Sequence, residues 1–432
     1  MSVHATSRTA TAVVFALAPL LAPAASCHAP RSTPSDRAAG PRLARSVQEA
    51  ASGEGAGAEL ANEPKNAAKP VAATAPRRRA SGPVSVRLSS LEALPRLELV
   101  DGDGTRHIAT RAASKVRTAS GEHAQLELKA APGRPIEVGA LRFSGAVRVQ
   151  VGRDGQWEIF NELDLEPYVA CVVARELGFG DLPAQAWRAQ AIAARSYAVA
   201  NLEQRSAARP DPYLFDGVRD QAYAGLPLPR NARERESLER LMAAVASTRG
   251  SILLEEGACV DARYSASCGG ATADGRAVFP ELRSTCLASV ACAPCAASAD
   301  SRWSWTAPTE ALEKLARERG LGARVVRLEV LRRDSSGRWL EVELVGDARS
   351  QRLRFEELRR ELGREKLRSA RILDTWPGLG EHLSGGLLFR GAGRGHGAGL
   401  CQLGALEFAR RGWSAERILQ HYYPGSGIED RR

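Results

Sequence analysis

Beyond residue 30, the sequence has no run of about 18 uninterrupted apolar residues, the length that a membrane-spanning helix needs. It has no internal repeat, which argues against a repeat protein. Seven histidines in 432 residues form no ligand-rich cluster, so a metal-dependent hydrolase is a weak interpretation. We therefore expect a folded body that stays in water and does not depend on a histidine-bound metal.

The glycine-rich run over residues 391–399 also lacks a dinucleotide-binding loop. In no register does it read G-x-G-x-x-G, because His396, Ala398 or Leu400 stands where the last glycine should be. Five glycines at every second position instead predict backbone that needs freedom in φ, or a close approach by a ligand. A tight structural loop is the alternative.

Charge is not concentrated on one folded segment. The net charge is +10, but residues 1–80 hold ten Lys and Arg against five Asp and Glu, which is half of the excess. Further along, Arg and Glu alternate over residues 230–240 and 352–368, as on solvated helix faces. This distribution argues against a nucleic-acid partner. A mildly positive field would suit an anionic polymer of the cell surface.

The first 27 residues have the pattern of an export signal. Arg8 precedes an apolar stretch from Thr11 to Ala25, and small residues lead to Cys27. Either Cys27 becomes the lipidated first residue of a lipoprotein, or the chain is cut near Ala25 and Cys27 is incidental. In both cases we expect the protein in the periplasm or cell envelope, with membrane contact only through the signal or a lipid anchor.

Residues 28–81 are rich in Ala, Pro, Gly, Ser and Arg without hydrophobic periodicity, and they predict a disordered linker. The rest of the chain, 82–432, has the composition of a globular domain, since the whole sequence is 44% hydrophobic and 25% charged.

Short alternating runs between Val84 and Phe160 predict strands. Residues 183–204 predict a buried helix that Pro183 opens, with an apolar face of Trp187, Ala191, Ala194 and Ala198. Further helices are expected at about 230–248, 309–319, 355–365, 400–411 and 415–423, and further strands at about 250–266, 324–333, 339–345 and 386–390. Because these blocks do not alternate regularly, the fold class is predicted to be α+β.

Three segments carry a family resemblance: Asn161–Leu177, Ala189–Ala200, and Gly395–Ala405 with the later His421-Tyr-Tyr-Pro-Gly. Weaker matches are Asp220–Gly225, Tyr264–Thr272 and Leu367–Ser369. Together they resemble the SpoIID/LytB family, the stage II sporulation protein D and amidase-enhancer group, over roughly residues 140–430. Several ordered blocks are far more specific than one motif.

The resemblance implies an exported peptidoglycan lytic transglycosylase that cleaves glycan strands stripped of stem peptides, with Glu176 as its catalytic residue. One carboxyl group suffices for this reaction: it protonates the glycosidic oxygen and then takes the proton of the muramic C6 hydroxyl, which closes a 1,6-anhydro ring. The role requires a raised pKa, and Val172, Val173, Leu177 and Phe179 surround Glu176 in sequence. A solvated glutamate at a helix end is the alternative.

By the same resemblance, Arg195, Gln221, Tyr223 and His396 are expected to position substrate. Arg195 would hold a sugar hydroxyl, a lactyl carboxylate or Glu176 itself, although a direct pair with Glu176 would lower the pKa of that acid. His396 would act either as a proton shuttle or as a hydrogen-bonding loop residue. Asp164 and Glu166 are expected to be solvent-side turn residues.

Of eight cysteines, four lie within 28 residues: Cys268, Cys286, Cys292 and Cys295. They predict either a tetrahedral zinc site or two disulfides, and an exported protein slightly favours disulfides. No cofactor is expected to be required. Cys401 stands where the resembled family usually has serine; Cys171 and Cys401 are expected either to pair or to be small buried hydrophobes.

A second function remains open at this point. The amidase-enhancer branch of the resemblance allows a non-catalytic module that binds glycan and stimulates an N-acetylmuramoyl-L-alanine amidase. Peptidoglycan glycan strands are the expected partner in both interpretations.

Overall fold

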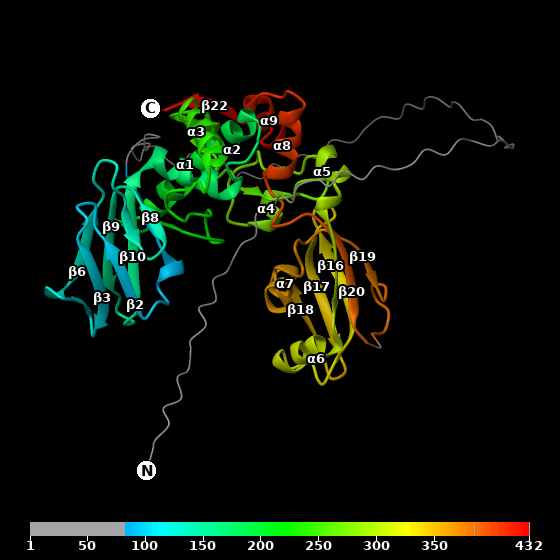
Figure 1. Ribbon diagram of the computed structural model, residues 1–432. Coiled ribbons are helices and arrows are strands. Elements are labelled where there is room, and N and C mark those ends of the chain that lie inside the picture. Colours follow the sequence, from blue (N-terminus) through cyan, green and yellow to red (C-terminus); the bar gives the residue numbers. More distant parts are fainter. Residues whose placement is uncertain (1–82, 384, 432) are drawn as a thin grey trace, which may run out of the picture. The chain divides into compact units, whose positions relative to one another are not determined.

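The computed structural model describes residues 83–383 and 385–431 (Figure 1). The expected signal at 1–27, the lipidation site Cys27 and the linker over 28–81 lie outside the described residues. Within the described ranges, no helix is both long and apolar enough to cross a membrane.

The chain begins with strands, as the alternating runs predict. Two sheets form there, with the orders β11-β1-β10-β9-β6 and β5-β4-β3-β2-β7-β8. The antiparallel pair of β1 and β10 joins the start of this region to its end, since Val86 lies opposite Asn161. The strands are β1 (Pro83–Arg87), β2 (Arg96–Val100), β3 (Arg106–Ala112), β4 (Lys115–Thr118), β5 (Gly121–His123), β6 (Gln125–Lys129), β7 (Ile136–Val138), β8 (Leu141–Phe143), β9 (Ala146–Val151), β10 (Trp157–Asp164) and β11 (Leu214–Phe215), with a 3-10 helix at Ser89–Leu91.

Three helices follow: α1 (Leu165–Glu176), α2 (Ala184–Ser206) and α3 (Ala232–Ala246). The predicted helix at 183–204 is confirmed as α2, and Pro183 is its N-cap residue. Of its 23 residues 15 are buried, because alanines on several faces let neighbouring elements approach closely. One face of α2, with Ala191 and Ala198, belongs to the core of the N-terminal sheets and α1. Another face, with Ala189 and Ile192, belongs to a second core with α8 and α9.

The second core is built from short elements and the C-terminal helices. They are β12 (Ser251–Glu255), β13 (Ala258–Cys259), β14 (Tyr264–Ser265), α4 (Gly275–Val278), α5 (Ala293–Ala297), β21 (Leu400–Cys401), α8 (Gln402–Arg410), α9 (Ala415–Tyr422) and β22 (Gly427–Asp430). The short parallel pair of β14 and β21 places Tyr264 opposite Leu400 and Ser265 opposite Cys401.

A third core lies in residues 303–389. It has two three-stranded sheets, β15-β20-β19 and β16-β17-β18. Its elements are a 3-10 helix at Ala299–Ser301, β15 (Arg302–Ala307), α6 (Thr309–Glu318), β16 (Val325–Arg333), β17 (Trp339–Gly346), β18 (Ser350–Arg354), α7 (Phe355–Leu362), β19 (Ile372–Trp376) and β20 (Leu387–Ala392).

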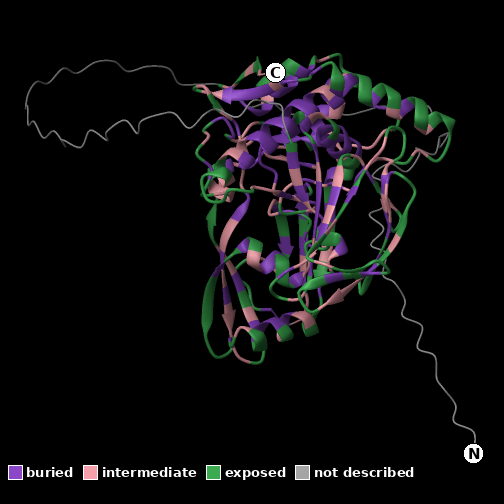
Figure 2. Ribbon diagram, turned by 90° about the vertical axis from the view of Figure 1, so that its left-hand side faces the viewer, coloured by how far each residue is buried: buried purple, intermediate pink, exposed green. Residues whose placement is uncertain are grey.

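Mixed sheets and helices confirm the predicted α+β class, and buried stretches run through both kinds of element (Figure 2). The expected helices at 230–248, 309–319, 355–365, 400–411 and 415–423 correspond to α3, α6, α7, α8 and α9. Helices α1, α4 and α5 and strands β11, β15, β18, β19 and β22 were not predicted, and β21 lies at the start of a range predicted as helix. The single domain expected over 82–432 stays a prediction.

The glycine-rich run has the left-handed backbone that its spacing predicts, with positive φ at Gly393, Gly395, Gly397 and Gly399. Other parts of the chain approach this run closely. A Cβ on Gly397 would collide with the Arg338 guanidinium, and one on Gly399 would collide with the Arg263 carbonyl oxygen. The run is therefore a tightly packed connection between β20 and β21.

Candidate active site

Glu176 is the last residue of α1, and its side chain is half-buried. Burial raises the pKa of its carboxyl group above the ordinary value, which outweighs the opposing effect of its hydrogen bonds. The C-terminal end of a helix carries partial negative charge, which disfavours a carboxylate there as well. The pKa of Glu176 is therefore shifted in the direction that a protonated general acid requires.

Neutral groups from three separate segments hold this carboxyl group. The Ala222 backbone N–H donates to Oε1 at 2.8 Å, and Nε2 of Gln402 donates to Oε2 at 3.3 Å. The Tyr264 side chain makes a further hydrogen bond. The β14–β21 pair brings Tyr264 and Gln402 together at this point, since Gln402 directly follows the end of β21.

Gln221 lies behind these contacts and does not reach the surface. It is 1% exposed. Its Nε2 donates to the Tyr264 hydroxyl at 2.8 Å, and its Oε1 accepts from the Tyr168 hydroxyl at 2.9 Å. Because the next residue, Ala222, donates to Glu176, Gln221 supports the site from behind; its role in substrate positioning stays a prediction.

Tyr223 is likewise enclosed. Its hydroxyl donates to Oδ1 of Asn161 at 2.5 Å, and its ring lies 5.4 Å from that of Tyr168. Asn161 in turn donates to the backbone carbonyls of Ser144 and Ala146. Tyr223 therefore ties the segment after β11 to strand β10, and its role in substrate positioning stays a prediction.

Arg195 has a different partner from those expected. Its side chain is fully buried and forms a bidentate ion pair with Glu166, at 2.9 Å from Nε and 2.7 Å from Nη2. Nη1 donates to the Ser251 carbonyl at 3.0 Å. In the structure Arg195 joins α1, α2 and β12, and its role in substrate positioning stays a prediction. The expectation that Glu166 is a solvent-side turn residue was wrong, whereas Asp164 is exposed.

His396 has a hydrogen-bonding role within its loop. Its Nδ1 accepts from the Ala398 N–H at 3.1 Å, and its ring packs edge-on against Phe279 at 5.0 Å. Burial, together with the charge of Arg263, lowers the pKa of His396 to about 3. The imidazole is therefore neutral at ordinary pH, and its role in substrate positioning stays a prediction.

Four buried cysteines gather near this site. The sulfur atoms of Cys268, Cys292, Cys295 and Cys401 all lie within 4.8 Å of one another, with the thiols free. The sequence predicted that Cys286 would be the fourth cysteine of this group. The structure has Cys401 there, and Cys286 lies outside the cluster. Disulfides among these residues and a Cys171–Cys401 pair are not formed in the described chain, where Cys171 is a buried free thiol.

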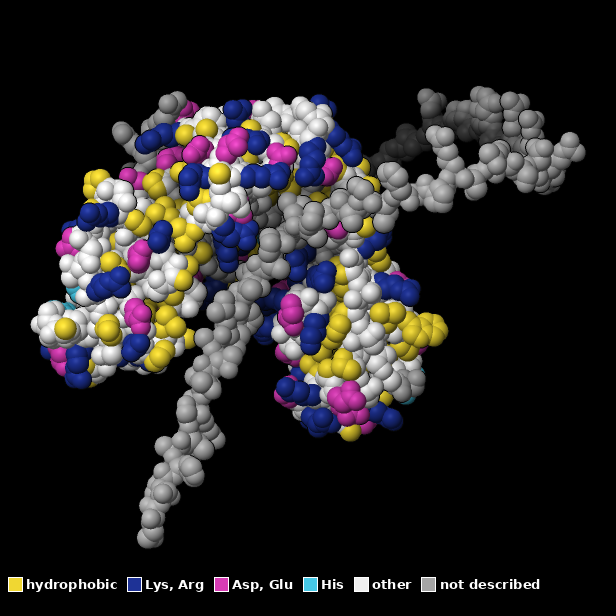
Figure 3. All heavy atoms as spheres, in the orientation of Figure 1, with side chains coloured by type: hydrophobic (Ala, Val, Ile, Leu, Met, Phe, Trp, Pro, Cys, Tyr) yellow, Lys and Arg dark blue, Asp and Glu magenta, His cyan; other side chains and the backbone are white. Residues whose placement is uncertain are grey.

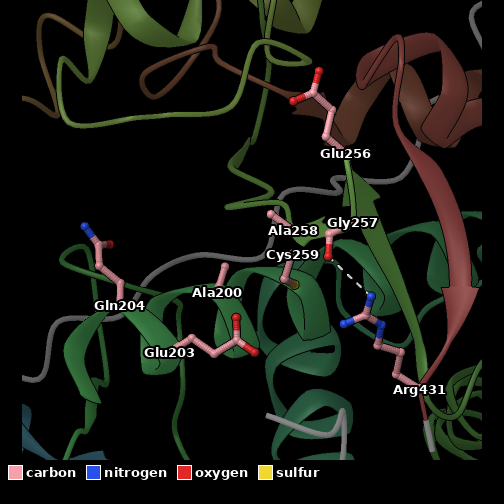
Figure 4. Close-up of a pocket in the computed structure, with 8 residues that line it drawn as sticks. All are labelled: Ala200, Glu203, Gln204, Glu256, Gly257, Ala258, Cys259 and Arg431. Carbon is pink, nitrogen blue, oxygen red and sulfur yellow. Dashed lines mark hydrogen bonds between the residues drawn. The ribbon is translucent and has the colours of Figure 1, made fainter. Parts of the chain in front are cut away.

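A cavity of about 300 Å³ lies elsewhere, at the C-terminal part of α2 (Figure 4). Its lining includes Ala200, Cys259 and Arg431, and Arg431 donates to the Gly257 carbonyl at 3.3 Å. Gln190, which contacts Gln402, lies ten residues before Ala200 on the same helix, a rise of about 15 Å. The cavity is therefore separate from Glu176.

The molecular face in Figure 3 shows basic side chains lying among acidic and apolar ones. Ion pairs such as Arg230–Glu234 and Arg319–Glu361 join many of the opposite charges. The alternation of Arg and Glu that the sequence shows is thus kept on the surface of the helices.

Comparison with known proteins gives the family of the segment that bears Glu176. Residues 153–254 match the family model SpoIID, stage II sporulation protein. This segment carries a SpoIID domain. A second model, a domain of unknown function (DUF8618), matches residues 297–399, the range that holds the third core.

Curated proteins similar to this chain are distant in sequence. Stage II sporulation protein D of Bacillus amyloliquefaciens is 26% identical over 66% of this chain and 79% of its own length. Stage II sporulation protein D of Bacillus subtilis (strain 168) is 25% identical over 72% and 88%. An uncharacterized protein of Brachyspira hyodysenteriae is 28% identical over 63% and 68%.

The sequence alone did not single out Gln402 and Tyr264 as neighbours of Glu176. Both lie in segments that carry the SpoIID resemblance, so the signal was present as polar residues inside matched blocks. Their contact with Glu176 depends on the β14–β21 pairing, which joins positions more than a hundred residues apart.

Proposed function

We propose that this protein is a peptidoglycan lytic transglycosylase with Glu176 as its general acid and base. The observation that carries the proposal is the half-buried Glu176 carboxyl group, whose pKa is raised and whose hydrogen-bonding neighbours are neutral. The match to the SpoIID family model supports it. Glycan strands, stripped of stem peptides, are the proposed substrate.

The two carboxyl oxygens have unequal environments. Oε1 accepts the shorter hydrogen bond, from a backbone N–H that the fold holds in place, and is suited to be the carbonyl oxygen of the protonated acid. Oε2 has the longer contact, to Gln402 at 3.3 Å. We assign the transferable proton to Oε2.

Cleavage then needs one proton to move in each direction. Glu176 gives its proton to the glycosidic oxygen as the C1–O bond breaks, and the leaving sugar departs with a hydroxyl group. The C6 hydroxyl oxygen of the muramic residue bonds to C1, and its proton returns to Glu176. Atoms balance without an activated water, so a second carboxylate is not required.

Mass spectrometry of the products tests the proposal. Purified wild-type protein and the Glu176→Gln variant are incubated with peptidoglycan, with and without prior amidase treatment. Anhydro-muramic products from the wild type alone are expected. Glu162→Gln, on β10, is the matched control, because Glu162 is a partly exposed glutamate paired with Arg148, and it should cleave like the wild type.

Two results would overturn the proposal. Reducing-end products would mean hydrolysis and a second carboxylate. Intact glycan with wild-type protein that still binds the strands would favour the non-catalytic enhancer of an N-acetylmuramoyl-L-alanine amidase.

We further propose that the protein acts outside the cytoplasm, in the periplasm or cell envelope, with lipidation at Cys27 as one form of attachment. Glycan strands rather than nucleic acid are its proposed partner.

A further inference from the structure

The four-cysteine cluster has the geometry of a site for a single metal ion. Cys268, Cys292, Cys295 and Cys401 come from four positions on three segments, and each sulfur lies within 4.8 Å of the other three. An ion with tetrahedral Zn–S bonds of about 2.3 Å holds its sulfur atoms about 3.8 Å apart. A small inward movement of the thiols would therefore complete such a site.

Backbone donors point at the sulfur atoms, which is a second and independent observation. The Gly269 N–H donates to Sγ of Cys295 at 3.1 Å, and the Cys268 N–H donates to Sγ of Cys401 at 3.2 Å. The Gly404 N–H also reaches Sγ of Cys401, at 3.3 Å. Such donors stabilise thiolates, which are the form of cysteine that binds metal.

Side chains around the cluster add further polar support. The Ser267 hydroxyl lies 3.1 Å from Sγ of Cys295, and the Tyr422 hydroxyl lies 3.2 Å from Sγ of Cys292. The fully buried Arg338 donates to the carbonyls of Cys268 and Ala271. A buried guanidinium beside the site offsets part of the negative charge of four thiolates around a divalent ion.

We propose that Cys268, Cys292, Cys295 and Cys401 bind one structural Zn²⁺ ion. All four positions are cysteine, so the site is closed and leaves no position for water or substrate. Binding replaces four thiol protons, which pass to solvent. The mutual distances suit one ion better than a multi-iron cluster, which spreads its thiolates around several metal atoms.

The proposed ion would hold the neighbours of Glu176 in register. Cys401 is the residue before Gln402, and the pair Ser265–Cys401 adjoins Tyr264–Leu400. The ion would thus fix both strands whose ends supply Tyr264 and Gln402 to the carboxyl group. This positioning role rests on the proposed function, but the metal site itself does not.

Metal analysis of the full-length protein tests the site without reference to activity. Protein purified without chelator should contain about one zinc per chain by inductively coupled plasma mass spectrometry. Native mass spectrometry should show the zinc adduct, and denatured protein should show the mass of the fully reduced chain. Substitution by Co²⁺ should give the absorption of a tetrahedral thiolate complex.

The variant Cys295→Ser should lose almost all bound zinc. Cys286→Ser is the matched control, because Cys286 is also buried and free but lies outside the cluster. Cys292→His, which keeps a metal ligand, should retain zinc where Cys292→Ser does not. Circular dichroism checks that each variant remains folded.

Two results would overturn the proposal. A chain about 4 Da lighter than the reduced mass and without zinc would show two disulfides in its place. A fully reduced, metal-free wild type that takes up no Zn²⁺ or Co²⁺ on titration would show four buried thiols with no metal function. A wild-type protein that binds zinc but does not cleave glycan would count against the proposed function and not against the metal site.

Discussion

At the scale of single residues, Glu176 is set apart by its surroundings rather than by its type. The chain has many glutamates, and those of the described residues lie on helices, strands and loops alike. Glu176 is half-buried, and the direct hydrogen bonds to its carboxyl group come from an amide N–H, an amide side chain and a phenol. A carboxyl group in this setting can hold its proton at a pH where an exposed one cannot.

The variant Glu176→Gln should lower the rate of glycan cleavage at least about a hundredfold, as expected when a general acid is removed. Binding to denuded strands should persist, because the amide keeps the size of the side chain. Rate and binding are measured separately, by product analysis and by sedimentation with insoluble glycan. A variant that still cleaves at a wild-type rate would remove Glu176 from the mechanism.

The same variant should alter how stability depends on pH. Since the folded pKa of Glu176 is raised, the unfolded chain loses this proton first as pH rises, and the free energy of unfolding falls between about pH 4.3, the ordinary glutamate value, and the folded pKa. The free energy of unfolding of Glu176→Gln, relative to that of the wild type, should therefore be higher near about pH 7 than near about pH 4. Urea unfolding at both pH values measures this difference; equal differences would contradict the raised pKa.

His396 titrates in the opposite direction. Burial and the charge of Arg263 lower the pKa of His396 in the folded protein to about 3. Below about pH 6.5 the imidazole is therefore protonated in the unfolded chain while it is still neutral in the folded protein. The free energy of unfolding should fall as pH drops through this range, and His396→Gln should reduce the fall. Nuclear magnetic resonance titration of the ring should find no protonation near neutral pH. Protonation in that range would instead fit a proton shuttle.

At the scale of elements, the Arg195–Glu166 pair joins α1 to α2. The guanidinium is fully buried and the Glu166 side chain is 17% exposed. The hydrogen bond to the Ser251 carbonyl adds β12 to the same contact. Because α1 ends at Glu176, a loosened clamp would also move the carboxyl group.

Glu166→Ala should lower the free energy of unfolding by about 3 kcal/mol, because it leaves the buried Arg195 charge without its partner. Replacing both residues by apolar ones of similar size, Arg195→Met with Glu166→Leu, should cost less than the single change. Chemical denaturation of Arg195→Met, Glu166→Leu and the variant with both changes measures the coupling. Additive effects would mean that the ion pair does not act as a unit.

Prediction from sequence succeeded best for elements with a strong period. Helix α2 was predicted within two residues at each end, because an alanine-rich apolar face and Pro183 indicate it locally. Helix α1 was missed, since its buried residues Val169–Ala174 are apolar on all sides and show no amphipathic period. The Arg195–Glu166 contact spans 29 residues and two helices, so no local pattern indicates it.

At the scale of the whole molecule, Arg338 links the third core to the cysteine segment. It lies just before β17, is fully buried, and donates to the carbonyls of Cys268 and Ala271. The Arg338→Met variant keeps much of the volume but leaves both carbonyls unpaired. It should lower the free energy of unfolding by about 2 to 3 kcal/mol and weaken zinc retention against a chelator.

Calorimetry and the rate of zinc release measure these two effects. Arg332→Met is a suitable control, since Arg332 forms an exposed ion pair on the neighbouring strand. Equal behaviour of Arg338→Met and Arg332→Met would show that the third core and the cysteine segment are energetically independent.

The sequence by itself determined the α+β class, the main helices, the family resemblance and the candidate acid, because periodicity and ordered motif blocks are local properties. It did not determine what each matched residue touches. Arg195, Gln221 and Tyr223 were expected to position substrate; the fold buries all three and gives each a partner inside the protein, which no local pattern indicated.

Only the tertiary structure decided the composition of the cysteine cluster. The sequence groups Cys286 with Cys268, Cys292 and Cys295 by proximity, but the fold replaces it with Cys401, which is 133 residues from Cys268. The physical reason is the pairing of β14 with β21, which carries Cys401 into the core. The same pairing brings Gln402 and Tyr264 into contact with Glu176, and the spacing of these residues along the chain does not predict that contact.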